Sequence, residues 1–204
     1  MVKRLVMAGH DLSRAFDSGI YPQLLLSAEA RGLNQSIVHV YMDMYSKLYV
    51  VLKVPVSNGY VLSRVRIRVW KGIRQGGVSS PPLYNNSVVE AQKKVITSFI
   101  FRSLDLSFAN YADDVLNLSR TYAGIEENFD ILSYEYKQIG LRFIPEKSEV
   151  ALVGKSTGRS SAENIRLGLH FSKPSSSITY LGLPIGSSLK HTWSLLLEFL
   201  SERL

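Results

Sequence analysis

The chain has 204 residues, of which 46% are hydrophobic and 10% aromatic, so it can bury one sizeable core, and wholesale disorder is excluded. It has no cysteine, which excludes disulfides and thiolate zinc sites, and its four histidines lie too far apart in sequence to form a zinc-binding pair. The net charge of +7 indicates either a polyanionic partner, nucleic acid or an anionic membrane, or a merely basic soluble protein.

The first residues place a basic pair before an apolar stretch, as a secretory signal does. His10 and Asp11 interrupt that stretch too early for a signal peptide. No segment approaches the roughly 20 apolar residues that a membrane span needs. We therefore expect a soluble, intracellular protein without a membrane partner, in either the nucleus or the cytoplasm.

Residues 2–12 are predicted to form a strand that runs into a turn. A first helix is predicted to begin near Pro22 and to reach about Ala30, with Gly32 as its stop. A second helix is predicted to follow from Asn34, because apolar side chains recur there at helical spacing. These side chains are Ile37, Tyr41, Met44, Tyr45 and Leu48.

Residues 50–70 are predicted to form a β-hairpin around Asn58-Gly59, a strong signal for a two-residue turn. The second arm alternates basic and aliphatic side chains, which therefore point to opposite sides of the ribbon. The basic set is Arg64, Arg66 and Arg68, and the aliphatic set is Val65, Ile67 and Val69.

Three further helices are predicted along the chain. One opens at Pro81-Pro82, after the polar loop 71–77, and runs as far as Val95. The next is amphipathic and ends at Gly140. The last covers about 189–203. The apolar side chains of the amphipathic helix are Ile125, Phe129, Leu132, Tyr136 and Ile139.

Strand-like segments at 104–111 and 115–119 flank a tight turn at Ala112-Asp113-Asp114. The small polar residues of Gly154–Glu163 predict a flexible loop and a candidate boundary. The order of elements predicts an α+β fold, with helices on one face of a largely antiparallel sheet. Further short strands are predicted at 141–144, 149–153, 165–171 and 177–183.

Two adjacent carboxylates, Asp113 and Asp114, stand at the turn between apolar strands. A surface turn would also place aspartates there. Adjacent acids in a central hairpin, however, repel each other unless a cation lies between them. Asp11 also follows an apolar strand, where it is either a helix cap or a third carboxylate beside the pair. Three such carboxylates can bridge two divalent ions roughly 4 Å apart, an arrangement suited to phosphoryl transfer.

Five motifs in order then resemble those of reverse transcriptases from non-LTR (LINE-type) retrotransposons, and together they span nearly the whole chain. DLSRAFD (11–17) resembles motif A, GIRQGGVSSPPLYN (72–85) motif B, YADD (111–114) motif C, GLRFIPEKS (140–148) motif D, and YLGLPIG (180–186) motif E. Each alone is weak, and the order and spacing of all five are specific. The resemblance implies the palm of a right-hand polymerase.

The resemblance also implies catalytic roles. Asp11 and Asp113 would bind metal, with Asp114 completing the acidic set. The metal would be Mg²⁺, two ions, with Mn²⁺ as an alternative, because hard cations take oxygen ligands. Lys147 would donate a proton to pyrophosphate. Without the resemblance, Lys147 is more simply a solvated lysine at the start of a strand.

Binding roles follow in the same way. Phe16 would lie beneath the incoming sugar and exclude a 2′-hydroxyl, although alone it reads as a core aromatic. Arg14 and Ala15 would lie near the triphosphate, and Gln75 and Gly76 would contact the nucleotide and template, although such residues are also ordinary in turns. The primer grip would comprise Tyr180, Leu181 and Gly182. The candidate contacts to the nucleic-acid backbone are Arg64, Arg66, Arg68, Lys71 and Arg74.

The match departs from the family at His10, where an apolar residue is expected, and at Pro82 and Pro145. None of these removes a proposed catalytic residue. We expect the palm, with partial fingers, over 1–186 and the start of a thumb or connection helix over 187–204, with the thumb otherwise absent. The chain would then be a fragment of a larger polymerase or a decayed element copy.

Three functions are therefore weighed. The first is an RNA-directed DNA polymerase that uses an RNA template, a DNA primer and deoxynucleoside triphosphates. The second is a catalytically silent, transposon-derived remnant that binds nucleic acid. The third is an RNA-templated RNA polymerase, against which Phe16 argues because an RNA-making enzyme must admit the 2′-hydroxyl.

Overall fold

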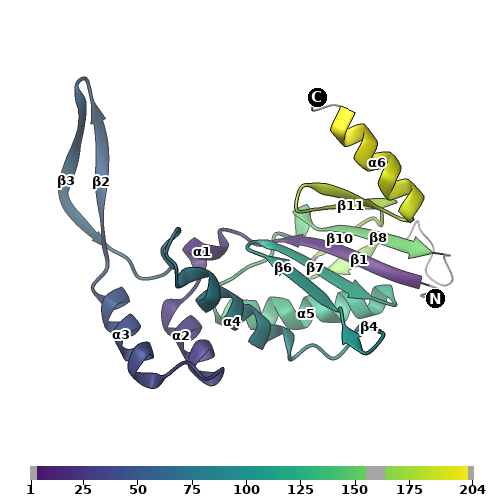
Figure 1. Cartoon of the computed structure of the whole chain (residues 1–204), viewed down its shortest axis with the longest axis horizontal. Helices are drawn as coiled ribbons and strands as arrows, with labels where there is room; N and C mark the ends of the chain where they lie inside the picture. The colour runs from purple at the N-terminus through teal and green to yellow at the C-terminus, as the bar shows by residue number, and fades with distance from the viewer. Residues whose placement is uncertain (1–3, 155–163, 202–204) are drawn as a thin grey trace. The chain divides into compact units, whose positions relative to one another are not determined.

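The computed structural model describes residues 4–154 and 164–201, which belong to two compact units (Figure 1). The sheet unit comprises Met1–Ala15 and Ala91–Leu204, and the hairpin unit comprises Phe16–Glu90. The boundary predicted at Gly154–Glu163 falls on residues 155–163, which lie outside the described residues.

The sheet unit is built on four antiparallel strands in the order β6-β7-β1-β8. Strand β1 is central, and Val6 and Ala8 within it are fully buried, because both faces of the sheet are covered. The predicted antiparallel sheet is thus confirmed. The strands are β1 (Arg4–Asp11), β6 (Phe108–Tyr111), β7 (Asp114–Ser119) and β8 (Glu149–Gly154).

One face of this sheet is covered by helix α5 (Tyr122–Gln138) and by the strand pair β9 (Ile165–Leu167) and β10 (His170–Ser172). The hydroxyl of Thr121 caps the helix by accepting a hydrogen bond from the amide of Gly124 at 3.0 Å. The helix was predicted correctly, and all five of its predicted apolar side chains are buried. These are Ile125, Phe129, Leu132 and Tyr136 within the helix and Ile139 at its C-cap.

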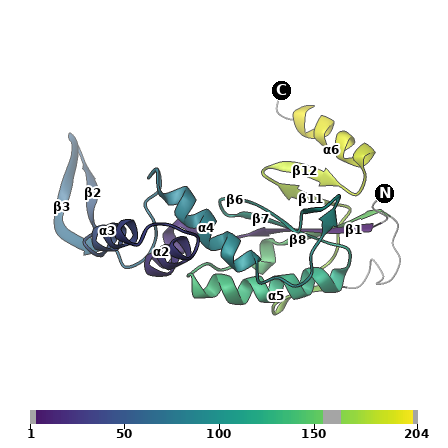
Figure 2. The same cartoon turned by 60° about the horizontal axis from the view of Figure 1, so that its bottom comes forward.

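The opposite face is covered by the hairpin of β11 (Ser177–Tyr180) and β12 (Leu183–Gly186), as Figure 2 shows. Ile178 packs there with Met7 of β1 and Ala151 of β8. At Gly9, β11 lies close to β1, and a β-carbon there would be in van der Waals contact, at 3.4 Å, with the carbonyl oxygen of Thr179. Helix α6 (Leu189–Ser201) contacts β12.

The hairpin unit begins within α1 (Ala15–Ser18) and continues with α2 (Tyr21–Ala30) and α3 (Gln35–Ser46). The α3 stripe was predicted only in part. Tyr45 is buried, but Ile37 and Met44 are nearly half exposed, and Val38 faces the core instead. Spacing marked the helix correctly but not the side that packs against α2. The small core of the unit comprises Leu25, Ala28, Val38 and Leu83.

The predicted β-hairpin is present as β2 (Tyr49–Val56) and β3 (Gly59–Arg68). Its turn lies one residue earlier than predicted, at Ser57-Asn58, because Gly59 already pairs with Val56 and has φ of +134°. The arginines and aliphatic residues of β3 alternate as expected. Neither face of the ribbon is buried.

Helix α4 (Ser80–Gln92) begins at the predicted prolines but ends before Val95. The strand predicted at 104–111 is interrupted, because β4 (Ile100–Phe101) and β5 (Leu104–Asp105) form a separate small hairpin. The segments 165–171 and 177–183 were each predicted to be one strand, but each forms two. The strands are joined by turns at Gly168 and at Leu181-Gly182.

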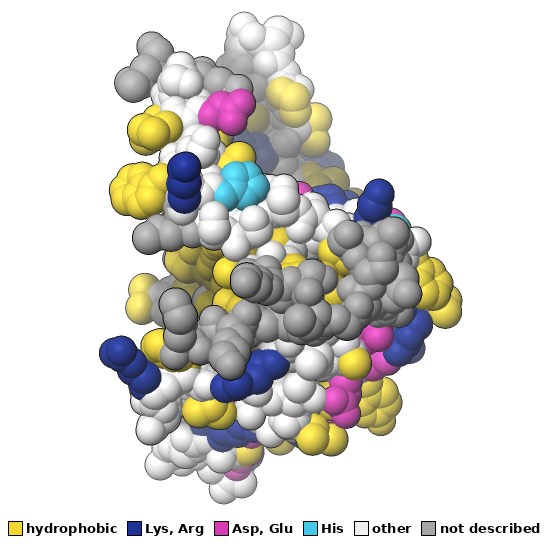
Figure 3. All heavy atoms as spheres, turned by 90° about the vertical axis from the view of Figure 1, so that its right-hand side faces the viewer, with side chains coloured by type: hydrophobic (Ala, Val, Ile, Leu, Met, Phe, Trp, Pro, Cys, Tyr) yellow, Lys and Arg dark blue, Asp and Glu magenta, His cyan; other side chains and the backbone are white. Residues whose placement is uncertain are grey.

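The predicted strand at 141–144 is wrong, since only Phe143 there makes a single bridge, to Leu12. Its backbone leads instead into the 3₁₀ turn η1 (Pro145–Lys147). No helix in the described part of the chain is long and apolar enough to cross a membrane. On the face drawn in Figure 3, basic, acidic and hydrophobic side chains are interspersed.

Candidate active site

Two of the predicted carboxylates meet at one end of the central strands. Asp11 is the last residue of β1 and Asp114 the first of β7, and they are paired in the antiparallel register. The amide of Leu12 donates a hydrogen bond to the carbonyl oxygen of Asp113 at 3.0 Å. Strand pairing therefore brings motifs A and C together, although about 100 residues separate them.

Asp113 lies in the two-residue turn that joins β6 to β7, since Tyr111 pairs with Asp114. The preceding residue, Ala112, has φ of +52°, in the left-handed region that costs a residue with a side chain roughly 1–2 kcal/mol. Strained backbone of this kind persists where the surrounding structure enforces it. Here the ladder on both sides holds the acidic turn in place.

The three carboxylates influence one another electrostatically. The pKa of Asp114 is raised, first by burial and then by the negative charges of Asp113 and Asp11. A raised carboxyl pKa means that the ionised form is disfavoured there. Burial and the two neighbouring negative charges therefore act in the same direction on the Asp114 carboxyl.

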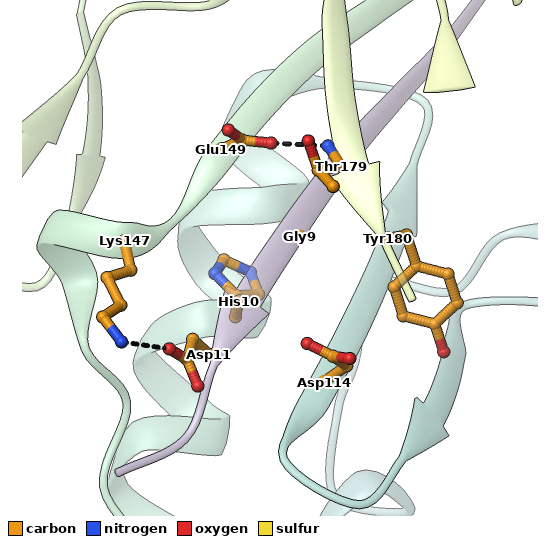
Figure 4. A pocket seen from close by; sticks show the side chains of 8 residues that line it. All are labelled: Gly9, His10, Asp11, Asp114, Lys147, Glu149, Thr179 and Tyr180. Carbon is orange, nitrogen blue, oxygen red and sulfur yellow. Dashed lines mark hydrogen bonds and ion pairs between the residues drawn. The ribbon is translucent and has the colours of Figure 1, made fainter. Parts of the chain in front are cut away.

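Motif D places a positively charged side chain, Lys147, beside Asp11. The ammonium of Lys147 donates a hydrogen bond to Oδ2 of Asp11 at 2.8 Å (Figure 4). This hydrogen bond and the charge of Asp11 raise the pKa of Lys147, with a further contribution from the charge of Asp113. Lys147 is therefore protonated at neutral pH, as a proton donor must be.

The turn η1 delivers Lys147 to this position. The amide of Ile144 donates a hydrogen bond to the carbonyl oxygen of Asp11 at 2.9 Å, and the amide of Lys147 closes the turn onto Ile144 at 3.0 Å. Pro145 at the start of the turn restricts its backbone. The unexpected proline of motif D thus stands where a rigid turn is needed.

A cavity of about 200 Å³ opens over these groups (Figure 4). Tyr180 enters it from β11, and its pKa is raised by burial and by the charge of Asp114. Motif E is thereby placed beside motif C. The cavity is lined by Gly9, His10, Asp11, Asp114, Lys147, Glu149, Thr179 and Tyr180.

Four of the lining residues, Gly9, His10, Glu149 and Thr179, were not predicted as site residues. Glu149 accepts a hydrogen bond from the amide of Thr179 at 2.5 Å, which ties β11 to β8. His10 is buried between Phe129 and Phe143, each with a ring centroid 5.2 Å from its own. Only His10 carried a sequence signal, as a polar residue inside an apolar strand.

His10 is neutral at physiological pH. Burial lowers its pKa to about 3, because a charged imidazole would lose its hydration in this core. Its Nδ1 atom lies 2.9 Å from the hydroxyl oxygen of Ser148, the residue after Lys147. Nε2 has no hydrogen-bond partner among the described residues.

The donor chemistry at this end of the sheet fits a hard divalent cation. Carboxylate oxygens are the ligands that Mg²⁺ and Mn²⁺ prefer. The pKa of Asp114 is raised first by burial and then by the charges of Asp113 and Asp11, and a bound cation would offset the part that the neighbouring charges cause. In residues 4–154 and 164–201, no three acidic or histidine side chains already form a preassembled cluster. Asp11 and Asp114 are the paired oxygen donors, with Asp113 next in the chain.

Motifs A and B are joined within the hairpin unit. The amide of Ile73 donates a hydrogen bond to the carbonyl oxygen of Phe16 at 2.7 Å, and Nε2 of Gln75 donates one to Oδ1 of Asp17 at 3.0 Å. The ring of Phe16 stacks on Tyr84, with centroids 5.1 Å apart. Phe16 is thus half-buried. This exposure is compatible with both predicted roles, a core aromatic and a ring beneath the incoming sugar.

A second cavity, of about 570 Å³, lies in the hairpin unit. It brings together three predicted contact residues, Lys71, Arg74 and Gln75, with Asp17. Arg14 is exposed with φ of +48°, Ala15 is buried, and Gly76 has φ of +76°. Arg64, Arg66 and Arg68 are exposed on β3.

A family model described as "Reverse transcriptase (RNA-dependent DNA polymerase)" matches residues 3–185. Two relatives are Pol polyproteins of type-1 retrotransposable element R2. That of Nasonia vitripennis is 26% identical over 89% of this chain, and that of Bradysia coprophila is 28% identical over 84%. The chain spans 17% and 20% of the lengths of these relatives.

Among solved structures, similar folds are found in telomerases. Apo telomerase from Candida Tropicalis, truncated from its C-terminal domain, has a TM-score of 0.60 and 16% identity, over 90% of this chain and 34% of that one. Telomerase from Candida albicans in complex with a TWJ fragment of telomeric RNA has a TM-score of 0.54 and 16% identity, over 89% of this chain and 30% of that one. At this identity the likeness concerns the fold.

Proposed function

The chain belongs to the reverse transcriptase (RNA-dependent DNA polymerase) family, and we propose that it is the palm segment of a non-LTR retrotransposon polymerase, which extends a DNA primer along an RNA template. The observation that carries this proposal is the pairing of Asp11 with Asp114 in the β1–β7 ladder, with Lys147 bound to Asp11. Two acidic motifs and a cation are thus held at one point by backbone register.

We propose that Asp11, Asp113 and Asp114 hold two Mg²⁺ ions, for which Mn²⁺ could substitute. Bound there, the ions would neutralise the charge of the reacting phosphate and lower the pKa of the attacking 3′-hydroxyl. The protein's own contribution is to fix the carboxylates. The paired strands place Asp11 and Asp114, and the strained Ala112 turn places Asp113 beside them.

Lys147 would act on the leaving group. In nucleotidyl transfer, the primer oxygen bonds to the α-phosphorus while the bond to pyrophosphate breaks, and the departing oxygen gains negative charge. The protonated Lys147 can donate a proton to that oxygen. Its contact with Asp11 raises the pKa of the amine, so the proton that a lysine already carries at neutral pH is held more firmly.

Most of the proposed nucleotide contacts lie in the hairpin unit, whereas Arg14 and Ala15 belong to the sheet unit. Phe16, backed by Tyr84, presents a flat ring that would exclude a 2′-hydroxyl and so select deoxynucleoside triphosphates. Gln75 and Gly76 would contact nucleotide and template, and the exposed Arg14 would face the triphosphate. Ala15 is buried, so it would contribute through its backbone.

Template and primer would be bound largely through phosphates. The arginines of β3 form an exposed basic row, and Lys71 and Arg74 lie at the mouth of the hairpin-unit cavity. Such contacts weaken as salt rises, because binding releases counterions. On the sheet unit, the turn that includes Tyr180, Leu181 and Gly182 would hold the primer end next to Asp114.

The extent of the palm is part of the proposal. Residues 1–186 would form the palm with partial fingers, and 187–204, including α6, would begin the thumb or a connection. Among the described residues, helix α6 makes its main contacts with the outer hairpin strand β12. That peripheral position suits an element that continues into another domain.

Primer extension tests the proposal. The chain, and a longer form that includes flanking sequence, are incubated with a primed RNA template, Mg²⁺ and deoxynucleotides, beside Asp113→Asn and the matched variant Asp105→Asn. We expect extension by the wild type and Asp105→Asn and loss of at least a hundredfold in Asp113→Asn. Equal incorporation by all three forms would sink the proposal.

The alternatives give different outcomes in the same assay. A silent nucleic-acid-binding remnant, suggested by the net charge of +7, would bind RNA and DNA with salt-dependent affinity but extend no primer. An RNA-making polymerase would incorporate ribonucleotides as well as deoxynucleotides. Replacement of Phe16 by Val should relax this discrimination only if the ring limits the 2′ position.

A further inference from the structure

A buried polar side chain lies directly behind the carboxylate site. His10 and Asp11 are consecutive in β1, so their side chains leave opposite faces of the sheet. Asp11 faces the cavity, whereas the ring of His10 is packed between Phe129 of α5 and Phe143. An apolar residue would fill this space without the cost of burying a ring nitrogen that has no partner.

The other ring nitrogen of His10 does have a partner, the hydroxyl of Ser148. Nδ1 lies 2.9 Å from the hydroxyl oxygen of Ser148, and Ser148 is itself buried, with 6% of its surface exposed. The hydroxyl of Ser172 donates a further hydrogen bond to the carbonyl oxygen of Ser148 at 3.2 Å. Ser148 is therefore a fixed point in the backbone, directly after Lys147.

The turn that carries Lys147 is thus anchored at both ends by neighbouring residues of β1. At its start, the amide of Ile144 donates a hydrogen bond to the carbonyl oxygen of Asp11 at 2.9 Å. At its end, Ser148 is bound by the side chain of His10. Between these anchors, the amide of Ser148 closes the turn onto the carbonyl oxygen of Pro145 at 3.0 Å.

Lys147 needs such an anchor, because its own side chain offers little. That side chain is 63% exposed, and ordering a lysine side chain costs rotamer entropy. Its 2.8 Å contact with Asp11 therefore depends on where the backbone of the turn starts the side chain. A shift of the turn would move the ammonium away from the carboxylates.

We propose that His10 is a positioning residue, which acts through the hydroxyl of Ser148 to hold the motif D turn where Lys147 reaches Asp11. This rests on the proposed function for the use made of Lys147, but the positioning itself is a property of the turn. The competing explanation is that His10 only fills the core between Phe129 and Phe143.

The first experiment is independent of activity. The ε-methylene resonance of Lys147, identified by its absence in Lys147→Met, is followed by NMR in the full chain. We expect Ser148→Ala and His10→Leu to move it toward the position of a free lysine. The amides of Lys147 and Ser148 should also exchange with deuterium roughly three- to tenfold faster, the range for one lost hydrogen bond.

Two variants serve as controls. Ser148→Thr keeps the hydroxyl and should leave both measurements as in the wild type. Ser87→Ala removes another buried serine hydroxyl, which donates to the carbonyl oxygen of Leu83 at 3.1 Å in the hairpin unit, and it should leave the Lys147 resonance unmoved. An unmoved Lys147 resonance in Ser148→Ala would overturn the positioning role.

The second experiment asks whether the anchor acts through Lys147. In primer extension, Ser148→Ala should lower kcat about three- to tenfold with an unchanged KM for the nucleotide, and Ser148→Thr should restore it. In a Lys147→Met background, Ser148→Ala should cause no further loss. The same fractional loss in both backgrounds would contradict the proposal. If the wild type extends no primer, the proposed function fails, while the NMR experiment still decides the positioning role.

Discussion

The ammonium of Lys147 lies 2.8 Å from Oδ2 of Asp11, across 136 residues of sequence. The contact raises the pKa of Lys147, because the negative charge of Asp11 favours the charged ammonium. It also means that the cation of motif D and the first carboxylate of motif A share one charge cluster, which includes Asp113. Several measurable consequences follow from that cluster and from the elements that hold it.

Removing the charge of Asp11 should lower the pKa of Lys147. That pKa is raised above its ordinary value chiefly by the hydrogen bond and charge of Asp11. In Asp11→Asn we therefore expect it to return most of the way to the ordinary lysine value, as measured by NMR titration of the lysine side chain. Asp105→Asn is the matched control and should leave it unchanged; a constant pKa in Asp11→Asn would refute the assigned cause.

The ionised carboxylate of Asp114 should destabilise the folded state when divalent cations are absent. Its pKa is raised in the folded state, so at neutral pH its ionisation favours the unfolded chain. We expect Asp114→Asn to raise Tm in chelator-treated buffer, measured by calorimetry. Added Mg²⁺ or Mn²⁺ should stabilise the wild type more than Asp114→Asn, because the variant has lost a ligand. Equal stabilisation of both forms would argue against this carboxylate as a metal ligand.

His10 should make the fold sensitive to acid. Burial lowers its pKa from the ordinary value of 6.5 to about 3, so the unfolded chain binds a proton first as pH drops below 6.5. The free energy of unfolding is therefore unaffected by His10 above pH 6.5 and decreases progressively as pH falls from 6.5 toward 3. From pH 7.5 to 5 the expected loss is about 2 kcal/mol in the free energy of unfolding.

The matched variant for this pH effect is His10→Leu. Other groups titrate over the same range, so the informative quantity is the difference between wild type and variant in urea unfolding at each pH. As pH falls from 7.5 to 5, the free energy of unfolding of the wild type should decrease relative to that of His10→Leu by about 2 kcal/mol. Parallel pH curves would show that His10 does not titrate as its burial predicts.

Glu149 should hold the β11–β12 hairpin over the carboxylate site. Its carboxylate accepts a hydrogen bond from the amide of Thr179 at 2.5 Å. In Glu149→Ala we expect the Thr179 amide to exchange about three- to tenfold faster, and the KM for the primer to rise. Glu149→Gln keeps an acceptor oxygen and should behave nearly as the wild type, so a similar change in both variants would point to charge instead.

Gly72 should be required for the junction of motifs A and B. Its φ is +90°, and a β-carbon there would lie 2.9 Å from the carbonyl oxygen of Asp17. We expect Gly72→Ala to destabilise the fold by about 2 kcal/mol or more, measured by urea unfolding. Gly32→Ala, at φ of +97° in open space, carries only the backbone strain and should cost about 1–2 kcal/mol. Equal effects would remove the steric argument.

Much of the architecture was predictable because it depends on local patterns. Apolar spacing marked α5, capped by Thr121 and ended before Gly140, and Pro22 and Gly32 bounded α2. Tight turns were harder to place, because a turn is set by backbone angles that several sequences share. The hairpin turn at Ser57-Asn58 therefore lies one residue from its prediction.

The face that an element buries was predicted less well. In α3, Ile37 and Val38 are adjacent and equally apolar, so the helical period allows either to face inward. Only the position of α2 decides between them, and it selects Val38. The roles of the site residues also stay predictions. The motifs identify candidate residues, but they do not show what those residues contact in a complex.

By itself, the sequence determined the order of the motifs and the strand ends at which Asp11, Asp113 and Asp114 stand, because those follow from residue type and local period. Tertiary structure alone decided that Asp11 faces Asp114 in register, that Lys147 binds Asp11, and that His10 reaches Ser148 behind them. Such contacts join residues about 100 to 140 apart, and their geometry depends on strand register and on packing against α5. Local sequence carries no signal for either.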